Sequence, residues 1–220
     1  MTGGRRIVAD TQKRLIFHIT HIDNLPAIIN SGGLSSDRRL LGVSGGRIVI
    51  GYEEIKRRRL DELSVHCHPG TRVGDYVPFY FCPRSPMLYV IHRRNAGLSF
   101  KGGQERVVHL VSTVELAVQA AADRPFAFSD GNAGTRFTQF SKDLGQLDSL
   151  VDWNAVGELY WSDSAVKERK QAEFLVHDSF PWTAIAAIGV INQSVEDDVK
   201  AILELAVHRP MIAVKPDWYY

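Results

Sequence analysis

Short segments rich in β-branched and aromatic residues recur along the chain, separated by short helical patterns. They do not follow the regular strand–helix–strand order of a parallel, doubly wound sheet, so the pattern indicates an α+β fold. Pro78 lies inside one segment and cannot donate to a ladder, which predicts an edge strand or a bulge there. We expect strands at 15–22, 76–82, 106–111, 172–177, 185–191 and 210–215, with 86–92 also extended.

Capping residues place the helices between these strands. Asp23 or Asn24 begins a short helix that ends at Gly32-Gly33. Ser112 and Glu115 have the spacing of a capping box. Further helices are expected at 52–64, 112–122, 152–160 and 195–206, whereas 35–48 and 65–75 are loop-like and 125–151 shows only weak periodicity.

The composition is that of a globular protein, with 45% hydrophobic and 23% charged residues in a chain of 220. No apolar run has the length of a membrane span, and the N-terminal residues lack the apolar core of a signal peptide. The two cysteines are too few for a disulfide scaffold. We therefore expect a cytoplasmic protein with one domain at 15–220, preceded by a flexible arm at 1–14.

Charge is segregated along the chain although the net charge is only +1. A globally basic nucleic-acid binder is not indicated. Between Arg38 and Arg59, however, seven basic residues accompany two acidic ones. Such a segment could bind a polyanion, although charge alone favours a solvated basic helix face.

Arg59 is placed unusually for a charged residue in the expected helix at 52–64. On a helical wheel it falls between Ile55 and Leu63, on the apolar face. An inward arginine needs a partner, because an unpaired buried charge is costly. An internal salt bridge and an arginine that faces an anion in a cleft are both compatible with this placement.

Glu173 raises the same question on a strand, since it alternates with Ala172 and Phe174 and shares a face with Leu175. A carboxylate between hydrophobic neighbours is either paired or functional. His18 and Thr20 form a polar pair on one face of the first strand. Whether these side chains converge on one cleft cannot be derived from spacing alone.

Common catalytic signatures are absent from the sequence, including nucleotide-binding glycine loops and zinc-protease motifs. The cluster His66-Cys67-His68 resembles a metal site only superficially, because three consecutive residues do not readily ligate one ion. We expect no metal.

Several stretches together resemble the DarT family of DNA ADP-ribosyltransferase toxins, and we identify the chain as a member on this ground. They occur in the family's order along nearly the whole chain. These stretches are FHITHIDNLPAIINSGGL (17–34), YEEIKRRR (52–59), DYVPFYFCPRSPMLY (75–89), GGQERVVHLVS (102–112), RKQAEFLV (169–176) and DWYY (217–220).

The resemblance implies a single-domain ADP-ribosyltransferase fold, a mixed β-sheet core flanked by helices. It also implies transfer of ADP-ribose from NAD, as co-substrate and without a metal, to a base in single-stranded DNA. Glu173 matches the catalytic glutamate, which would stabilise charge at the ribose carbon and assist proton transfer. Arg59 matches the arginine that would assist activation of the base. The cofactor would be held by His18, Thr20, Asn24, Tyr80 and Arg84.

The resemblance further implies a DNA-binding surface and a partner protein. Contacts with DNA would come from Lys167, Arg169, Lys170 and Met87. The loop at 35–48 would cover the pocket and could be disordered until NAD binds. The target base is expected to be thymine. The partner would be a macrodomain antitoxin of the DarG type, and the toxin itself would be a monomer.

Other functions remain compatible with the sequence. A related branch of the family modifies guanine, and the same fold could act on RNA or protein. A binding module without turnover, or a domain in which Arg59 and Glu173 are only structural partners, would use the same residues differently.

Overall fold

The computed structural model describes residues 14–43, 45–135 and 137–220. In that part of the chain an eight-stranded sheet is accompanied by a two-stranded one. Neighbouring strands are antiparallel except for β9 and β10, which are parallel. The order of the large sheet is β10 (Met211–Val214), β9 (Ala187–Val190), β4 (Val107–Thr113), β1 (Leu15–His21), β3 (Tyr76–Tyr80), β7 (Ala172–His177), β5 (Phe126–Asn132) and β6 (Phe140–Ser141), and the small sheet pairs β2 (Gly33–Ser35) with β8 (Ser179–Pro181).

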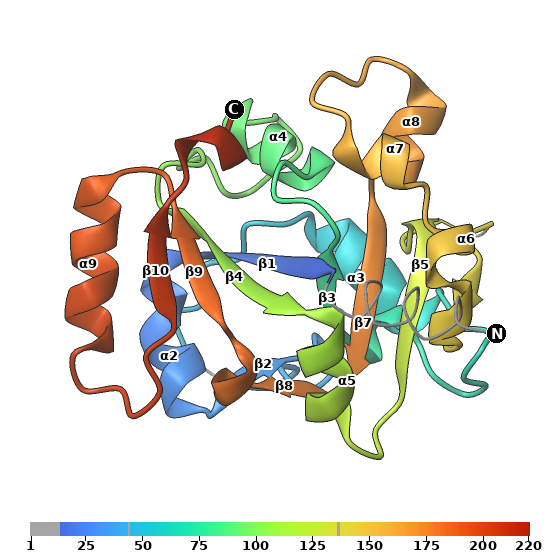
Figure 1. Ribbon diagram of the computed structural model, residues 1–220, viewed down its shortest axis with the longest axis horizontal. Helices are drawn as coiled ribbons and strands as arrows, with labels where there is room; N and C mark the ends of the chain where they lie inside the picture. The colour runs from blue at the N-terminus through green and yellow to red at the C-terminus, as the bar shows by residue number, and fades with distance from the viewer. Residues whose placement is uncertain (1–13, 44, 136) are drawn as a thin grey trace, which may run out of the picture.

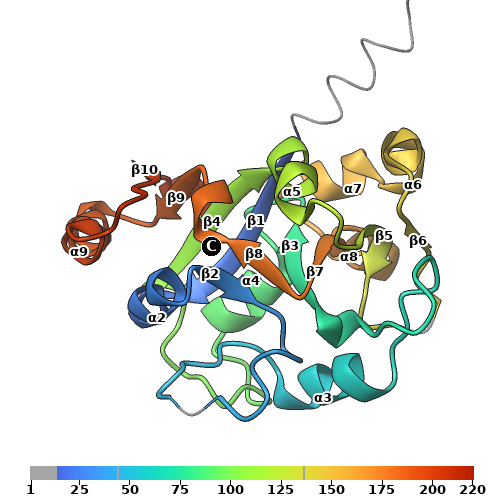
Figure 2. The ribbon, with the colours of Figure 1, turned by 90° about the horizontal axis from the view of Figure 1, so that it is seen from below.

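Short helices surround the large sheet, which confirms the α+β class (Figures 1 and 2). The helices are α2 (Leu25–Asn30), α3 (Glu53–Asp61), α4 (Pro86–His92), α5 (Val114–Ala121), α6 (Leu147–Leu150), α7 (Trp153–Gly157), α8 (Ser164–Arg169) and α9 (Gln193–Leu203). Figure 1 shows α9 beyond β10, far from α7 and α8. Among the described residues no helix is both long and apolar enough to cross a membrane. The expected arm at 1–14 lies outside the described residues except for Arg14.

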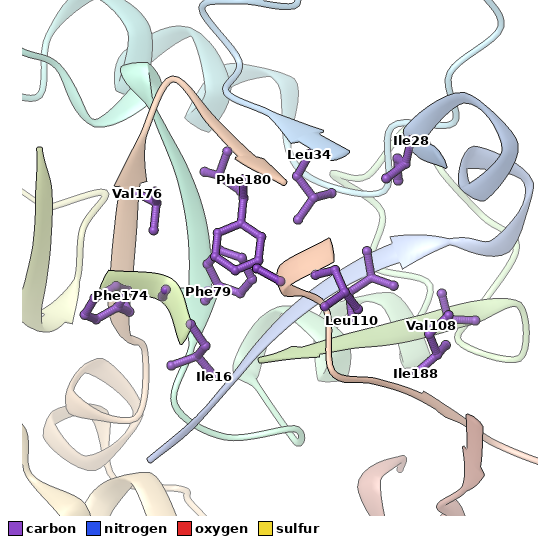
Figure 3. Close-up of a cluster of buried hydrophobic side chains, with 14 of the residues drawn as sticks. Ile16, Ile28, Leu34, Phe79, Val108, Leu110, Phe174, Val176, Phe180 and Ile188 are labelled. Carbon is purple, nitrogen blue, oxygen red and sulfur yellow. The ribbon is translucent and has the colours of Figure 1, made fainter. Parts of the chain in front are cut away.

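The main hydrophobic core lies against one face of the large sheet (Figure 3). Phe79 of β3 and Phe174 of β7 are fully buried there, and Phe180 of β8 packs on Phe79 with ring centroids 4.7 Å apart. Each such side chain stabilises the fold by about 1.5–3 kcal/mol through burial. The small sheet approaches closely at Gly33, where a Cβ atom would lie 2.1 Å from the carbonyl oxygen of Phe180. Glycine is therefore required at that position.

Most expected strands are present with slightly shorter bounds, but the extended segment predicted at 86–92 is wrong. These residues form α4. The Ser85 hydroxyl accepts a hydrogen bond from the Leu88 N–H, and Pro86 occupies the first turn. Both are helix-starting signals, which outweighed the apolar character of the segment. The weakly periodic region 125–151 contains β5, β6 and α6.

Helix boundaries moved by a few residues. The residue that caps α5 is Thr113 and not Ser112, because the Thr113 hydroxyl accepts from the Leu116 N–H. Asp152 caps α7 as predicted, but that helix ends at Gly157 rather than near Tyr160. The last helix begins after the Asn192 cap. The expected helices at 52–64 and 24–32 are confirmed as α3 and α2.

Pro78 lies in β3, between β1 and β7, so the prediction of an edge strand is wrong. A proline is nevertheless tolerated at this position, because β3 pairs with β1 only at Tyr80, opposite Phe17. At Pro78 the carbonyl oxygen accepts a hydrogen bond from the His18 ring, 2.8 Å away. The N–H and C=O of one strand residue point to the same side. The N–H that proline lacks would therefore have pointed toward β1, where the two strands are no longer paired.

Candidate functional site

A cleft opens where β1 and β3 separate. His18 and Thr20 of β1 line it together with Pro78 and Tyr80 of β3 and with Met87 of α4. The segment 35–51 and α3 supply the opposite wall, through Ser35, Asp37, Arg47, Ile48, Val49, Ile50, Gly51 and Lys56. Of the loop expected at 35–48, Ser35, Asp37, Arg47 and Ile48 line the cleft, and Ser44 lies outside the described residues.

His18 is neutral in this cleft. Burial lowers its pKa to about 4, although the hydrogen bond to Pro78 acts in the opposite direction. The Pro78 carbonyl can only accept, so Nδ1 of the neutral ring carries the proton. Nε2 is then left as an acceptor, suited to a hydroxyl group of a ligand in the cleft.

Asn24 acts as a clamp between the strand and the covering segment. Its Nδ2 donates to the Thr20 Oγ1 at 3.1 Å and to the Ile48 carbonyl at 2.9 Å. Its Oδ1 accepts from the Ile48 N–H at 2.9 Å. Asn24 lines the cleft, but these bonds commit both of its donors, so its main effect is to fix the backbone at Ile48.

Two cationic side chains line the wall opposite His18. They are Arg47, whose pKa is lowered by burial, and Lys56, whose Nζ lies 2.9 Å from Asp37 Oδ1. One carboxylate between two cations leaves this wall with a net positive charge. Such a wall can bind an anionic group such as a diphosphate.

Arg59 and Glu173 form a bidentate ion pair. Nη1 lies 3.0 Å from Oε1 and Nη2 lies 2.8 Å from Oε2, and their side chains are only 12% and 3% exposed. Burial alone would lower the pKa of Arg59, but the Glu173 carboxylate more than offsets this and raises it. The inward direction predicted for Arg59 is confirmed, whereas Ile55, expected on the same face, is 38% exposed.

Tyr80 lies between the Arg59–Glu173 ion pair and the cleft. It is the β3 partner of Glu173 in the ladder and also lines the cleft. Burial and the nearby Glu173 carboxylate raise its pKa well above the usual range, so it stays a neutral phenol. Arg59 and Glu173 are themselves beside the cleft and not among its lining residues.

The backbone of Glu173 is fixed by a serine that sequence reasoning missed. The Glu173 N–H donates to the Ser129 Oγ at 2.9 Å, and that hydroxyl donates to the Gly131 carbonyl. A register shift between Phe128 and Asn132 of β5 allows this contact. Beyond it, the Asn132 amide donates to the Gln171 Oε1 at 3.0 Å. Such a bulge leaves no regular sequence signal.

Other residues proposed from the sequence lie away from the cleft lining. Arg84 is stacked over the Tyr220 ring, with Cζ 4.4 Å from its centroid, and lines a separate hollow beside Trp153 and Trp218. Lys170 is 1% exposed and its Nζ donates to the Val156 carbonyl at 2.7 Å. This burial contradicts the predicted contact of Lys170 with DNA. Arg169 is exposed and pairs with Asp152.

The members of the cluster His66-Cys67-His68 make separate contacts within the fold. His68 Nε2 bonds to the Phe126 carbonyl at 2.8 Å, and the His66 ring packs against Phe140. Burial raises the pKa of the Cys67 thiol. Nowhere in the described ranges do three or more His, Cys, Asp or Glu side chains group in a way that could hold a metal ion.

Comparison with known proteins shows the family of this chain. The family model described as "ssDNA thymidine ADP-ribosyltransferase, DarT" matches residues 17–220. A DNA ADP-ribosyl transferase of Thermus sp. (strain 2.9) is 40% identical over 208 residues, which are 93% of this chain and 95% of the relative. The chain belongs to the DarT family.

Solved structures of Thermus sp. 2.9 DarT superpose on this fold. The complex with ADP-ribosylated single-stranded DNA has a TM-score of 0.85 at 38% identity, covering 94% of this chain and 97% of that one. The complex with NAD+ has a TM-score of 0.82 at 37% identity, covering 95% and 98%. A fusion of a DNA ADP-ribosyl transferase with a DNA ADP-ribosyl glycohydrolase, from Thermosipho africanus, is 26% identical and matches 93% of this chain and 48% of the fusion.

Proposed function

We propose that this protein transfers ADP-ribose from NAD to a thymine base of single-stranded DNA. The observation that carries the proposal is the bidentate Arg59–Glu173 pair beside a cleft with a neutral histidine and a cationic wall. The description of the matching family and the NAD-bound and DNA-bound Thermus relatives support the same reaction.

The cleft residues suit the parts of NAD. His18 Nε2 accepts from a ribose hydroxyl, and Arg47 with Lys56 neutralises the diphosphate. Tyr80 presents its ring and phenol next to Glu173, where the nicotinamide and its ribose would lie. When bound, NAD supplies an ADP-ribosyl group whose bond to nicotinamide breaks.

Glu173 stabilises the positive charge that develops at the ribose carbon as nicotinamide leaves. Each carboxylate oxygen has two lone pairs, and the pair with Arg59 uses one of each. The others can accept from a ribose hydroxyl without breaking the ion pair. A ring nitrogen of the base then forms the new bond to carbon and loses its proton, which the carboxylate can accept.

Arg59 stabilises the base as it loses that proton. The deprotonated base carries negative charge on its ring nitrogen and carbonyl oxygens, and a guanidinium with a raised pKa remains charged beside it. Met87 borders the cleft and would limit how the base enters. Lys167, exposed on α8, would contact the DNA backbone.

Mass spectrometry of single-stranded oligonucleotides incubated with NAD tests the reaction. The panel contains sequences without thymine and sequences without guanine. One added ADP-ribose that requires thymine, and is lost with Glu173→Gln, is the expected result. An adduct that requires guanine would overturn the choice of base, and RNA or protein adducts alone would overturn DNA as the acceptor.

We further propose that the protein is the toxin of a toxin–antitoxin pair, with a macrodomain antitoxin of the DarG type that removes the modification. The fusion of the two activities in the Thermosipho relative supports this pairing. Expression should arrest growth, and a co-expressed DNA ADP-ribosyl glycohydrolase should restore it. Growth arrest that persists with Glu173→Gln would contradict the proposal.

A further inference from the structure

A second hollow, of about 460 Å³, opens on the other side of the large sheet from the cleft. Consecutive residues of β1 divide between the two spaces, since Phe17 lines the hollow and His18 lines the cleft. The side chains of consecutive strand residues point to opposite faces of a sheet. Figure 2 shows α7, which borders the hollow, and α3, which borders the cleft, on opposite sides of the sheet. The hollow is therefore separate from the cofactor cleft.

Three buried nitrogen atoms of residues that line this hollow have no hydrogen-bond acceptor among the described residues. They are Nε of Arg14, Nε of Arg84 and Nε1 of Trp153. In the part of the chain that the structure describes, no other buried side-chain nitrogen or oxygen atom lacks a partner. Buried donors are nearly always paired, because a donor removed from water without an acceptor loses free energy. Their presence around one hollow indicates that an acceptor group binds there.

The lining of the hollow is also positively charged. Arg14, Arg84 and Lys170 accompany a single carboxylate, that of Asp217, which leaves an excess of two positive charges. Lys170 is 1% exposed, and its Nζ donates to the Val156 carbonyl although an ammonium group carries three donors. Within the described ranges no ion pair involves Arg84 or Lys170. A buried charge is costly without a counter-charge, and a bound anion would supply one.

Aromatic side chains form the walls of the hollow. Phe17 meets Trp218 edge-on with ring centroids 5.2 Å apart, and the Arg14 guanidinium carbon lies 4.1 Å above the centroid of Trp153. Phe81 lines the same space and packs edge-on against Trp153 at 5.3 Å. Ring walls with a few converging polar groups are typical of sites for small molecules, and they suit a planar apolar group.

We propose that this hollow binds a small phosphate monoester whose phosphate is attached to a planar ring. A monoester carries a charge of about −2 at neutral pH, which matches the excess of two positive charges. Its three terminal oxygens match the three unpaired donors, whereas a carboxylate offers only two oxygens. The ring of the ligand lies between the aromatic walls. The site goes beyond the proposed function, because it requires neither NAD nor DNA.

The indole N–H signals of the protein report directly on this site. Phenyl phosphate is the probe, and the readout is a proton–nitrogen correlation spectrum, in which Trp153→Phe identifies the Trp153 signal. Phenyl phosphate should move this signal downfield, because the N–H gains a charged acceptor. Trp182 is the internal control, since its Nε1 already donates to the His208 carbonyl at 2.9 Å. A Trp153 signal that stays in place, or moves no more than that of Trp182, overturns the proposal.

Trp153→Phe also tests the affinity, because it keeps an aromatic ring under Arg14 and removes only the N–H side of the indole. Isothermal titration with phenyl phosphate should show binding weakened about tenfold or more. Trp161→Phe makes the same exchange outside the lining of the hollow and should bind like the wild type. Equal affinities of Trp153→Phe and Trp161→Phe would exclude the predicted hydrogen bond.

A ligand series tests the chemical class. Phenol lacks the charge and should not bind, whereas inorganic phosphate lacks the ring and should bind more weakly than phenyl phosphate. Benzoate keeps the ring but has one charge and two oxygens, so it should also bind more weakly. Benzoate binding as tight as that of phenyl phosphate would refute the choice of a phosphate monoester.

Two further measurements separate this site from the cofactor cleft and from the DNA. Arg47→Ala alters the cleft and should leave the affinity for phenyl phosphate unchanged, whereas a loss would assign the binding to the cleft. A single-stranded oligonucleotide without a terminal phosphate should not move the Trp153 signal. A shift would make the hollow part of the DNA path and overturn the proposal. None of these readouts depends on ADP-ribose transfer, so failure of the proposed function and failure of this site are distinguishable.

Discussion

Glu173 illustrates how one side chain can be both structural and chemical. Its carboxylate is 3% exposed and shared with Arg59, so charge and hydrogen bonds are satisfied within the fold. The removal of one partner from a buried pair commonly destabilises a protein by about 3–5 kcal/mol, because the other charge remains. A useful substitution must therefore preserve the shape and hydrogen bonding of the carboxylate.

Glu173→Gln preserves the shape of the side chain and one of the two acceptors for Arg59. Its amide nitrogen replaces the other acceptor and the negative charge that stabilises the ribose carbon is lost, so thermal unfolding and NAD binding of the variant are measured beside its activity. Transfer should fall about 100-fold or more, measured as single-turnover adduct formation. Glu62→Gln, which alters a surface pair with Arg57 and Arg58, is the control and should keep full activity. Transfer at the control rate would refute the catalytic role of Glu173.

A substitution of Arg47 tests whether the cationic wall of the cleft binds NAD. Its guanidinium lines the cationic wall, so Arg47→Ala should weaken NAD binding about tenfold or more by removing a charge-assisted contact. Isothermal titration with NAD provides the measurement. Arg57→Ala removes a 61% exposed arginine from the outer side of α3 and should have no effect. Equal affinities of both variants would exclude Arg47 from the diphosphate site.

At the scale of elements, the site depends on contacts that hold a loop to a strand. Asn24 precedes α2 but makes no side-chain capping bond, so its hydrogen bonds serve the covering segment at Ile48 instead. Sequence spacing suggested a capping role for this residue. The side chain instead reaches a backbone segment 24 residues away, which no local pattern encodes.

Asn24→Ala should loosen the covering segment without unfolding α2. Hydrogen exchange of the Ile48 amide should accelerate, and the KM for NAD should rise while kcat is nearly unchanged. Asn24→Asp, which keeps the acceptor for the Ile48 N–H, should show a smaller rise. Unchanged exchange at Ile48 in Asn24→Ala would contradict the clamp.

An element could be predicted from the sequence where the residues that define it lie close together along the chain. Alternation placed Glu173 on a mostly buried strand, and helical periodicity turned Arg59 inward, so both members of the ion pair were identifiable. The segment 86–92 was mistaken because its apolar residues fit either period and only the Ser85-Pro86 start decides. Ser129 reaches Glu173 because of a register shift in β5, and Arg47 reaches the cleft because its loop folds over β1. Both positions depend on strands far away in the sequence, so no local pattern predicts them.

At the scale of the whole molecule, the C-terminal residues pack against β4 and β9 of the large sheet. Tyr219 donates to the Val107 carbonyl at 2.8 Å, and its hydroxyl lies 3.2 Å from His109 Nδ1. His109 is fully buried on β4, and its Nε2 bonds to the Pro83 carbonyl at 3.0 Å. One neutral histidine thus connects the end of the chain, a central strand and the segment that leads to α4.

This arrangement predicts that stability depends on pH. Burial lowers the pKa of His109 to about 4, below its ordinary value of 6.5. Between these values the unfolded chain binds the proton and the folded chain does not, so stability falls as pH decreases through this window. From pH 7 to pH 5 the loss from this residue is about 2 kcal/mol.

Urea unfolding at both pH values measures the effect. His109→Gln, which keeps a donor for the Pro83 carbonyl, should be less stable at pH 7 but should lose less on acidification. The same pH dependence in variant and wild type would exclude His109 as a source. His18, whose pKa is also lowered to about 4, adds a contribution of the same sign.

The separation of β1 from β3 has a consequence for how this cleft could be altered. Exchange of lining side chains changes what the cleft binds but leaves it open, because the opening itself lies in the main chain. Pro78 lies at this opening and lacks the N–H that another residue would carry there. Any other residue there would offer a new donor toward β1. We expect a substitution of Pro78 to draw β1 and β3 together and so to narrow the cleft. The proline ring would thus determine the shape of the binding site although it takes no part in the chemistry.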